Sequence, residues 1–291
     1  MVTTTLRGGP GVGVEALECA AELGAVYVPR EGYCIEDLIT AYGVQGVLAV
    51  GTKRVSLFYV QSGAGRLRTP FPKGEEESGA ESDGGAEINS GVTVLKEFYF
   101  HPGTAKLRIK NVLYGKPDQM VQAMGLRPGD SVLDCTLGLG ADAYVAGFVT
   151  GPDGRVLGLE KSAVLAAVVG HGLRRWFLEP EPLLQATMRR IEVKAADHLD
   201  YLSKAPAGGF DVVYFDPFFG TPVKGAFQVV PLRAIGETSP LTSEAVKEAV
   251  RVARRRVVMK ERRGGGECAR LGFERVVGGR YARVAYGVIE K

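Results

Sequence analysis

The chain has 291 residues, of which 45% are hydrophobic, and a formal net charge of +3. This length suits one large domain together with a smaller one. No segment approaches the ~18 consecutive apolar residues of a membrane-spanning helix, and residues 1–7 lack the pattern of a secretion signal. The four cysteines lie far apart without a CxxC pair, which argues against a zinc site or a disulfide framework. We therefore expect a cytoplasmic protein without membrane or metal partners.

The first 91 residues predict a small domain followed by an insertion. Residues 1–60 form an α/β domain, in which Gly24 and Gly43 end the two helices. The expected strands cover 2–6, 26–28, 46–50 and 55–59, and the expected helices cover 14–23 and 35–42. Residues 61–91 are rich in Gly, Ser and Glu and poor in large apolar residues, so they predict a mobile acidic insertion. It is either a long hairpin loop or a regulatory tail.

Residues 92–291 predict the larger domain. A strand over 92–100 and helices over 105–114 and 118–124 lead into it. Strands and helices then alternate, with strands at 131–135, 155–160, 191–194, 210–215 and 256–260 and helices at 141–148, 163–176, 198–203 and 243–253. This alternation predicts a mostly parallel sheet with right-handed crossovers. The last two strands, 273–277 and 283–289, predict an antiparallel hairpin, and the fold class is α/β.

A glycine loop follows the strand 131–135. Gly138 and Gly140, with Ala143 as the third small residue, match the dinucleotide-binding pattern between a strand and a helix. Glu160 ends the next strand, where a carboxylate can accept hydrogen bonds from both ribose hydroxyls of a nucleotide. By itself this loop fits a nicotinamide dinucleotide as well as S-adenosylmethionine.

Two further acids favour S-adenosylmethionine as the cofactor. Asp134 lies beneath the glycine loop, where its charge would repel a pyrophosphate but would suit a sulfonium cation and an amino-acid tail. Alternatively, Asp134 only caps the turn. Asp197 follows the strand 191–194 and can accept from the adenine amino group, or it can act as the N-cap of the helix that begins at His198.

The sequence Asp216-Pro217-Phe218-Phe219 indicates the reaction class. An exocyclic amine of a nucleobase is a poor nucleophile, because its lone pair is delocalised into the ring. The carboxylate of Asp216 and the carbonyl of Pro217 can accept the two amine protons and aim the lone pair at a methyl group. A neighbouring aromatic side chain can stack on the base. Alternatively, Phe218 and Phe219 plug the edge of the sheet.

Basic residues suggest where a substrate binds. The segment 251–263 contains seven Arg and Lys residues and one acid, which suits either phosphate contacts or a solvated helix surface. Lys260 ends an apolar strand and should point toward the site. Arg108 and Lys110 are expected on the exposed face of the helix 105–114. We therefore expect Lys260, Arg108 and Lys110 to contact the substrate.

These motifs together resemble a class I S-adenosylmethionine-dependent methyltransferase. More closely, they resemble the small-subunit ribosomal RNA (guanine-N2) methyltransferase J family and its uncharacterised Gram-positive relatives. The similar segments are the run from Asp134 through Ala143, Leu159–Lys161, Asp216–Phe219, Val257–Lys260, Phe98–Arg108 and Tyr27–Arg30. Outside 61–91, the resemblance covers most of the chain. It implies a Rossmann-like methyltransferase sheet in residues 92–291.

The resemblance also implies a set of cofactor contacts, which adds Ala141, Asp142, Lys161 and His198. The complete expected cofactor site is Asp134, Thr136, Gly138, Gly140, Ala141, Asp142, Glu160, Lys161, Asp197 and His198. This chain departs from the ribosomal RNA enzymes at Phe218, Gly220, Ala141 and the pair Asp197-His198. Those departures leave the identity of the methylated nucleotide open.

The expected function is S-adenosylmethionine-dependent N-methylation of a guanine or adenine amino group in structured RNA, with ribosomal RNA as the partner. The catalytic residues would be Asp216, Pro217, Phe218 and Phe219, and the base would be flipped into the pocket that they form. A methyltransferase for a protein or a small molecule remains an alternative. A non-catalytic RNA-binding factor that retains the cofactor fold is another, and a nicotinamide oxidoreductase is a third.

Overall fold

The computed structural model describes residues 1–6, 9, 11–61, 94–176, 180–217, 239–279 and 282–291. The chain divides into two compact units, Met1–Phe98 and Tyr99–Lys291. The predicted insertion 61–91 lies outside the described residues except for Gln61. No helix in the described part of the chain combines the length and apolar character that crossing a membrane requires.

The first unit is a four-stranded sheet in the order β1-β2-β3-β4 with two helices. Its elements are β1 (Val2–Thr4), α1 (Val12–Glu22), α2 (Ile35–Tyr42), β2 (Gly46–Val50), β3 (Val55–Gln61) and β4 (Val94–Tyr99). Strand β1 pairs parallel with β2, and β2 pairs antiparallel with β3. The predicted strand 26–28 is only a single bridge between Tyr27 and Val2. Apolar side chains of α2 and β2 form the core of this unit, including Leu38 and Val47.

The boundary between the units differs from the sequence prediction. Residues 92–100 were expected to lead into the second domain, but β4 hydrogen-bonds to the sheet of the first unit. The division therefore falls at Phe98/Tyr99 rather than after residue 91. Local sequence pattern identifies β4 as a strand but cannot assign its partner, because pairing depends on contacts distant in the chain.

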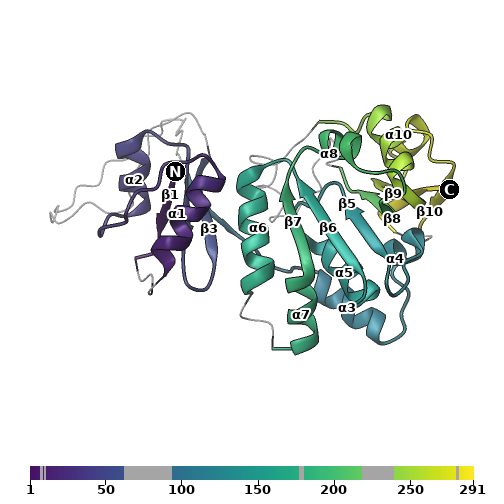
Figure 1. Ribbon diagram of the computed structural model, residues 1–291, viewed down its shortest axis with the longest axis horizontal. Coiled ribbons are helices and arrows are strands. Elements are labelled where there is room, and N and C mark those ends of the chain that lie inside the picture. Colours follow the sequence, from purple (N-terminus) through teal and green to yellow (C-terminus); the bar gives the residue numbers. More distant parts are fainter. Residues whose placement is uncertain (7–8, 10, 62–93, 177–179, 218–238, 280–281) are drawn as a thin grey trace, which may run out of the picture. The chain divides into compact units, whose positions relative to one another are not determined.

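The second unit is built on a seven-stranded sheet in the order β10-β11-β9-β8-β5-β6-β7 (Figure 1). The strands are β5 (Ser131–Asp134), β6 (Arg155–Glu160), β7 (Ile191–Ala195), β8 (Phe210–Phe215), β9 (Ala253–Arg262), β10 (Arg275–Val277) and β11 (Val284–Glu290). Strands β5 to β9 are parallel to one another, whereas β11 is antiparallel to both β9 and β10. The predicted mostly parallel sheet with a C-terminal antiparallel hairpin is confirmed.

Helices form two groups around this sheet. The helices are α3 (Ala105–Leu113), α4 (Gln119–Met124), α5 (Ala141–Thr150), α6 (Ala163–Arg175), α7 (Pro182–Arg190), α8 (His198–Lys204), α10 (Ser243–Val252) and α11 (Glu267–Arg270). Helices α3, α4 and α7 pack against α5, while α8 and α10 pack against each other and α10 covers β8 and β9. Neither α7 nor α11 is among the predicted helices. Helix α7 begins at Pro182, and proline is favoured in the first turn of a helix.

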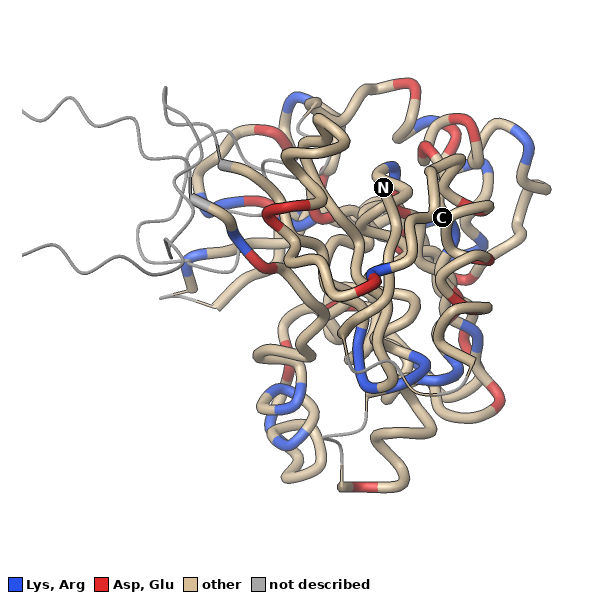
Figure 2. The backbone as a smooth tube through the Cα atoms, turned by 90° about the vertical axis from the view of Figure 1, so that its left-hand side faces the viewer, with Lys and Arg blue, Asp and Glu red and all other residues tan. Residues whose placement is uncertain are grey.

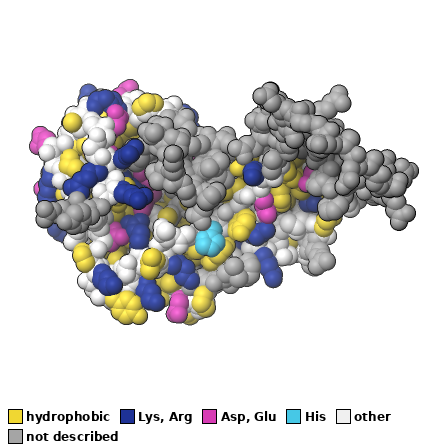
Figure 3. Space-filling model, turned by 180° about the vertical axis from the view of Figure 1, so that it is seen from behind, with side chains coloured by type: hydrophobic (Ala, Val, Ile, Leu, Met, Phe, Trp, Pro, Cys, Tyr) yellow, Lys and Arg dark blue, Asp and Glu magenta, His cyan; other side chains and the backbone are white. Residues whose placement is uncertain are grey.

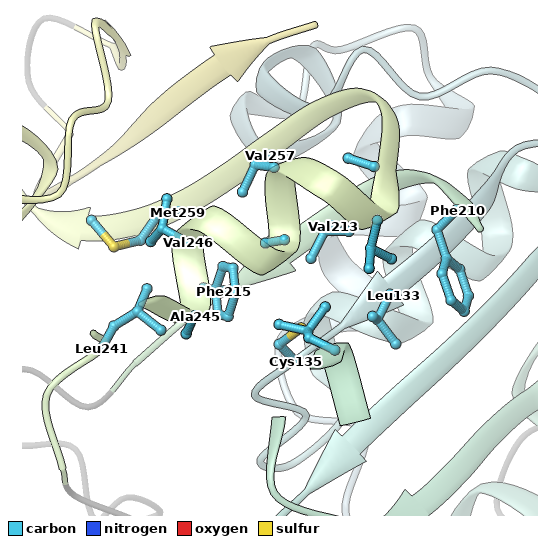
Figure 4. Packing of buried hydrophobic residues seen from close by; sticks show 14 of the residues in the cluster. Leu133, Cys135, Phe210, Val213, Phe215, Leu241, Ala245, Val246, Val257 and Met259 are labelled. Atoms are coloured by element: carbon cyan, nitrogen blue, oxygen red, sulfur yellow. The ribbon is translucent and has the colours of Figure 1, made fainter. Parts of the chain in front are cut away.

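Alternation along the strands determines which side chains face each group. Leu133, Val213 and Phe215 enter a core cluster with α8 and α10, which Figure 4 shows from close by. Because successive side chains of a strand point to opposite faces, Tyr214 points to the other side, toward α5. Lys260 on β9 also reaches α5. The sheet thus has one apolar face and a second face that carries buried polar groups near its carboxyl edge.

Candidate active site

Acidic residues mark the carboxyl ends of four neighbouring parallel strands. Asp134 ends β5, Glu160 ends β6, Asp197 follows β7 and Asp216 follows β8. These strands are adjacent in the order β8-β5-β6-β7, so the four acids share one edge of the sheet. Ligands of open α/β sheets bind at this edge. The structure therefore brings together the acids that the sequence singled out.

The glycine loop joins two of these strand ends. Gly138 has φ 50° and Gly140 φ 73°, in the left-handed region that favours glycine. The Gly138 amide donates to Glu160 Oε2 at 3.2 Å, and Ser162 N donates to Glu160 Oε1 at 2.9 Å. The buried side chain of Leu137 packs against Gly158. A Cβ atom at position 158 would lie only 3.0 Å from the Cγ atom of Leu137. The loop is thus fixed against β6, and the Glu160 carboxylate is oriented beside it.

Asp134 is a buried acid beneath the loop. Only 2% of its surface is exposed, and its Oδ1 accepts from Thr136 N at 3.0 Å. Burial raises the pKa of Asp134 to about 8, and the charges of Asp142 and Asp216 act in the same direction. The carboxyl group of Asp134 therefore caps the turn, which was one of the two roles predicted for it. A cation bound nearby would also favour its ionised form.

Asp197 is the N-cap of α8. Its Oδ1 accepts from Leu199 N at 2.9 Å and from Asp200 N at 3.3 Å, while Oδ2 lies 3.3 Å from Lys161 Nζ. Its pKa is lowered despite its burial, because these donors favour the charged form. The predicted role of Asp197 as a helix N-cap is therefore confirmed. Its role in cofactor binding is compatible with capping and stays a prediction. Next to Asp197, the His198 ring contacts Phe215 edge-on with centroids 5.8 Å apart.

Asp216 and Pro217 lie directly beside the glycine loop. Asp216 N donates to Thr136 Oγ1 at 2.6 Å, so the segment after β8 is tied to the segment after β5. Phe218 and Phe219 lie outside the described residues. The backbone hydrogen bond places the predicted amine-orienting peptide next to the predicted cofactor loop, which is the juxtaposition that a group transfer needs.

Lys260, Asp142 and Asp216 form a cluster of half-buried charges. Lys260 Nζ lies 2.7 Å from Asp216 Oδ2 and 3.2 Å from Asp142 Oδ2. Tyr214 Oη donates to Asp142 Oδ2 at 2.8 Å. The positive charge of Lys260, with Arg108, holds the pKa of Asp142 well below its usual value against the cost of burial. Lys260 points toward the site as predicted, but its ammonium is bound by acids of the protein.

Arg108 completes this cluster. Its guanidinium pairs with Asp142 and forms two hydrogen bonds with Asp118, at 2.8 and 3.0 Å. These acids raise the pKa of Arg108 although burial opposes them. The prediction that Arg108 is an exposed residue is therefore wrong, whereas Lys110 is exposed as expected. Asp118 and Tyr214 were not among the predicted site residues. The alternation of side chains along β8, which turns Tyr214 toward α5, is the sequence signal that pointed to one of them.

The basic segment 251–263 is not a single surface. At the start of β9, Arg254, Arg255 and Arg256 pair with Asp211, Asp130 and Glu290. Lys260 lies near the other end of the same strand. Along the whole described chain, Lys and Arg occupy several separate segments interspersed with Asp and Glu (Figure 2). These three arginines thus anchor the edge of the sheet that lies opposite the candidate active site.

The donor set suits S-adenosylmethionine. Acidic groups at the ends of β5, β6 and β7 can accept hydrogen bonds from an amino-acid tail, a ribose and an adenine amino group. Together with the parallel sheet and its antiparallel last strands, this site defines the class of S-adenosylmethionine-dependent methyltransferases with a Rossmann-like fold. No group of three or more His, Cys, Asp or Glu within the described ranges is arranged to hold a metal ion.

Comparison with known proteins gives the family. The chain belongs to the SAM-dependent methyltransferase family whose model, SAM_MT, matches residues 90–271. It is similar over its whole length to the uncharacterized protein YpiP of Bacillus subtilis (strain 168), with 35% identity over 290 residues, 100% of this chain and 99% of the relative. The protein is thus a methyltransferase with S-adenosylmethionine as its cofactor.

Relatives with a named RNA substrate match a shorter region. Ribosomal RNA small subunit methyltransferase J of Shewanella amazonensis is 33% identical over 153 residues, covering 50% of this chain and 59% of the relative. The same enzyme of Laribacter hongkongensis is 34% identical over 161 residues, covering 52% and 54%. The chain therefore spans little more than half the length of these curated relatives.

A solved structure confirms the fold over the whole chain. The SAM-dependent methyltransferase from Neisseria gonorrhoeae superposes with a TM-score of 0.57 and 17% identity, covering 99% of this chain and 95% of that one. Such a likeness shows the fold alone.

Proposed function

We propose that this methyltransferase modifies an exocyclic amino group of a base in structured RNA, with ribosomal RNA as the preferred substrate. The observation that carries the proposal is the hydrogen bond of Asp216 N to Thr136 Oγ1, which holds the Asp216-Pro217 peptide beside the glycine loop. The methyltransferase J relatives, whose printed names specify ribosomal RNA, support the choice of substrate.

The chemistry follows from the acceptors at the end of β8. S-adenosylmethionine, when bound, supplies an electrophilic methyl group. The Asp216 carboxylate and the Pro217 carbonyl would accept hydrogen bonds from the two amine N–H groups, so that the nitrogen lone pair turns toward the cofactor loop. Orientation of this kind replaces the intrinsic nucleophilicity that the conjugated amine lacks. Stacking of Phe219 on the base, with Phe218 beside it, rests on the sequence alone.

The outer face of α3 is the surface that we assign to RNA. Leu107, Leu113 and Tyr114 are exposed by 62%, 60% and 71%. Lys110 and Lys116 are exposed beside them, and residues 105–117 contain no acid. Lysines suit phosphates and an exposed tyrosine suits a base face. Figure 3 shows Lys and Arg side chains over much of the visible face of the second unit, with fewer Asp and Glu side chains.

Mass spectrometry of RNA nucleosides tests the proposal. RNA from cells with the gene should contain a base-methylated nucleoside that is missing when the gene is deleted, and the gene for Asp216→Ala should not restore it. Asp153→Asn, on an exposed turn before β6, is the matched control and should restore it. Identical nucleoside profiles with and without the gene would refute RNA methylation.

Two alternatives give different results in the same system. A methyltransferase for proteins or small molecules would bind S-adenosylmethionine but would show no RNA affinity that falls steeply with salt. A non-catalytic RNA-binding factor would show that salt-dependent affinity, while deletion of its gene would leave every methylated nucleoside in place.

A further inference from the structure

The cluster of half-buried charges is a chain of alternating charges that ends at Asp216. Starting at α4, its members are Asp118, Arg108, Asp142, Lys260 and Asp216. They come from the N-cap of α4 and from α3, α5, β9 and the end of β8, so residues far apart in the sequence meet at one point. Each member contacts the next one directly, and every cation lies between two acids.

Lys260 is the member that holds Asp216. Its side chain is only 21% exposed, and its ammonium directs two of its three donors to Asp216 Oδ2 and Asp142 Oδ2. We propose that Lys260 is a positioning residue for methyl transfer, which fixes one carboxylate oxygen of Asp216 so that the other faces the amine of the substrate. This inference rests on the proposed role of Asp216, and it replaces the prediction that Lys260 binds RNA.

The rest of the cluster gives Lys260 a defined position. Asp142 sits in the first turn of α5 and is itself held by Arg108 and by the Tyr214 hydroxyl. The Lys260 ammonium is therefore bound at two points, to Asp142 on a helix and to Asp216 beside the glycine loop. A long flexible side chain that is bound at both acids loses its rotamer freedom and acts as a rigid support.

Electrostatics make Lys260 important for the charge of Asp216. Burial disfavours the carboxylate of Asp216, and so does the negative charge of Asp142. Lys260 opposes these effects at 2.7 Å, and Arg108 contributes from farther away. Tyr214 and Tyr286, the strand partner of Lys260 on β11, are further titratable neighbours, and both keep their protons because burial and Asp142 raise their pKa values. Removing the Lys260 charge should thus leave Asp216 protonated at a higher pH.

Carboxylate NMR tests the inference without any substrate. In protein labelled with ¹³C at the aspartate carboxyl carbon, Asp216→Asn identifies the resonance of Asp216. Lys260→Met should raise the titration midpoint of Asp216 by at least about one pH unit, which corresponds to about 1.4 kcal/mol. Lys260→Arg should restore a midpoint near that of the wild type. An unchanged midpoint in Lys260→Met would overturn the inference.

Kinetics with the RNA substrate separate positioning from binding. Lys260→Met should lower kcat by about 10²-fold, the scale of a misplaced catalytic group, while KM for RNA and the Kd of S-adenosylmethionine change less than about twofold. A rise in KM with unchanged kcat would instead assign Lys260 to RNA contact. If the wild type methylates no RNA, the proposed function fails, whereas the NMR titration still decides whether Lys260 controls the charge of Asp216.

A second variant protects the test against misfolding. Lys260→Gln keeps a hydrogen-bond donor but no charge, so it should fold when Lys260→Met does not, and it should raise the Asp216 midpoint in the same direction. Thermal unfolding of each variant checks that the fold is retained. If Lys260→Gln folds and titrates like the wild type, the inference is wrong.

Discussion

Replacement of Asp134 by Asn should stabilise the protein at neutral and alkaline pH. Asp134 is 2% exposed and accepts one hydrogen bond, from Thr136 N, which an Asn oxygen can also accept. Burial raises the pKa of Asp134 from 3.8 to about 8. Between these two values the unfolded chain loses a proton that the folded protein retains. The free energy of unfolding therefore falls as pH rises through this window.

The size of the effect follows from the pKa shift. A shift of about four units corresponds to at most about 5–6 kcal/mol at pH 8, at about 1.4 kcal/mol per unit. Relaxation of the fold and entry of water reduce this cost, so we expect Asp134→Asn to raise the free energy of unfolding by about 1–3 kcal/mol at pH 8 and by little at pH 4. Urea unfolding at several pH values measures the difference. The quantity to compare is the free energy of unfolding of Asp134→Asn minus that of the wild type. If this difference is no larger at pH 8 than at pH 4, the reasoning is refuted.

The same substitution should weaken cofactor binding. The cationic groups of S-adenosylmethionine favour ionised Asp134, so the affinity of the wild type should increase as pH rises toward about 8, because less work is needed to remove the proton. Calorimetry on Asp134→Asn should show lower affinity and a flatter pH dependence. Asp153→Asn is again the control and should behave like the wild type.

The remaining predictions concern the loop and the two kinds of basic residue. Gly158→Ala should destabilise the fold by about 1–3 kcal/mol and weaken S-adenosylmethionine binding, because the added Cβ would displace Leu137. An unchanged free energy of unfolding in urea and an unchanged cofactor affinity by calorimetry would contradict this. Arg255→Gln should cost about 1–3 kcal/mol of stability, because it breaks the 2.6 Å ion pair with the buried Asp130, yet leave RNA affinity unchanged. Lys110→Gln, in contrast, should lower the affinity for RNA in filter binding and leave stability unchanged. If Arg255→Gln lowers RNA affinity and Lys110→Gln lowers stability, Arg255 is the RNA contact and Lys110 the structural residue.

Much of the sheet and its acidic edge can be predicted from the sequence alone. The strands Arg155–Glu160 and Phe210–Phe215 have the same bounds in the structure as in the prediction. Each is a short apolar run that stops at an acid or a turn, a local pattern that is typical of a buried parallel strand. The acids that follow these runs necessarily lie at the same sheet edge. Asp134, Glu160 and Asp216 could therefore be placed together before any coordinates were known.

Only the tertiary structure determined which charges are available to a ligand. Arg108 and Lys110 are two residues apart on one helix, yet the first is half-buried and paired with Asp118 and Asp142, whereas the second is exposed. Likewise, Lys260 faces the site but is already paired within the protein. Sequence shows that a residue carries a charge, but its partner is chosen by packing between segments that lie far apart in the chain. Because a buried charge must be paired, that choice separates the residues that support Asp216 from those that can meet RNA.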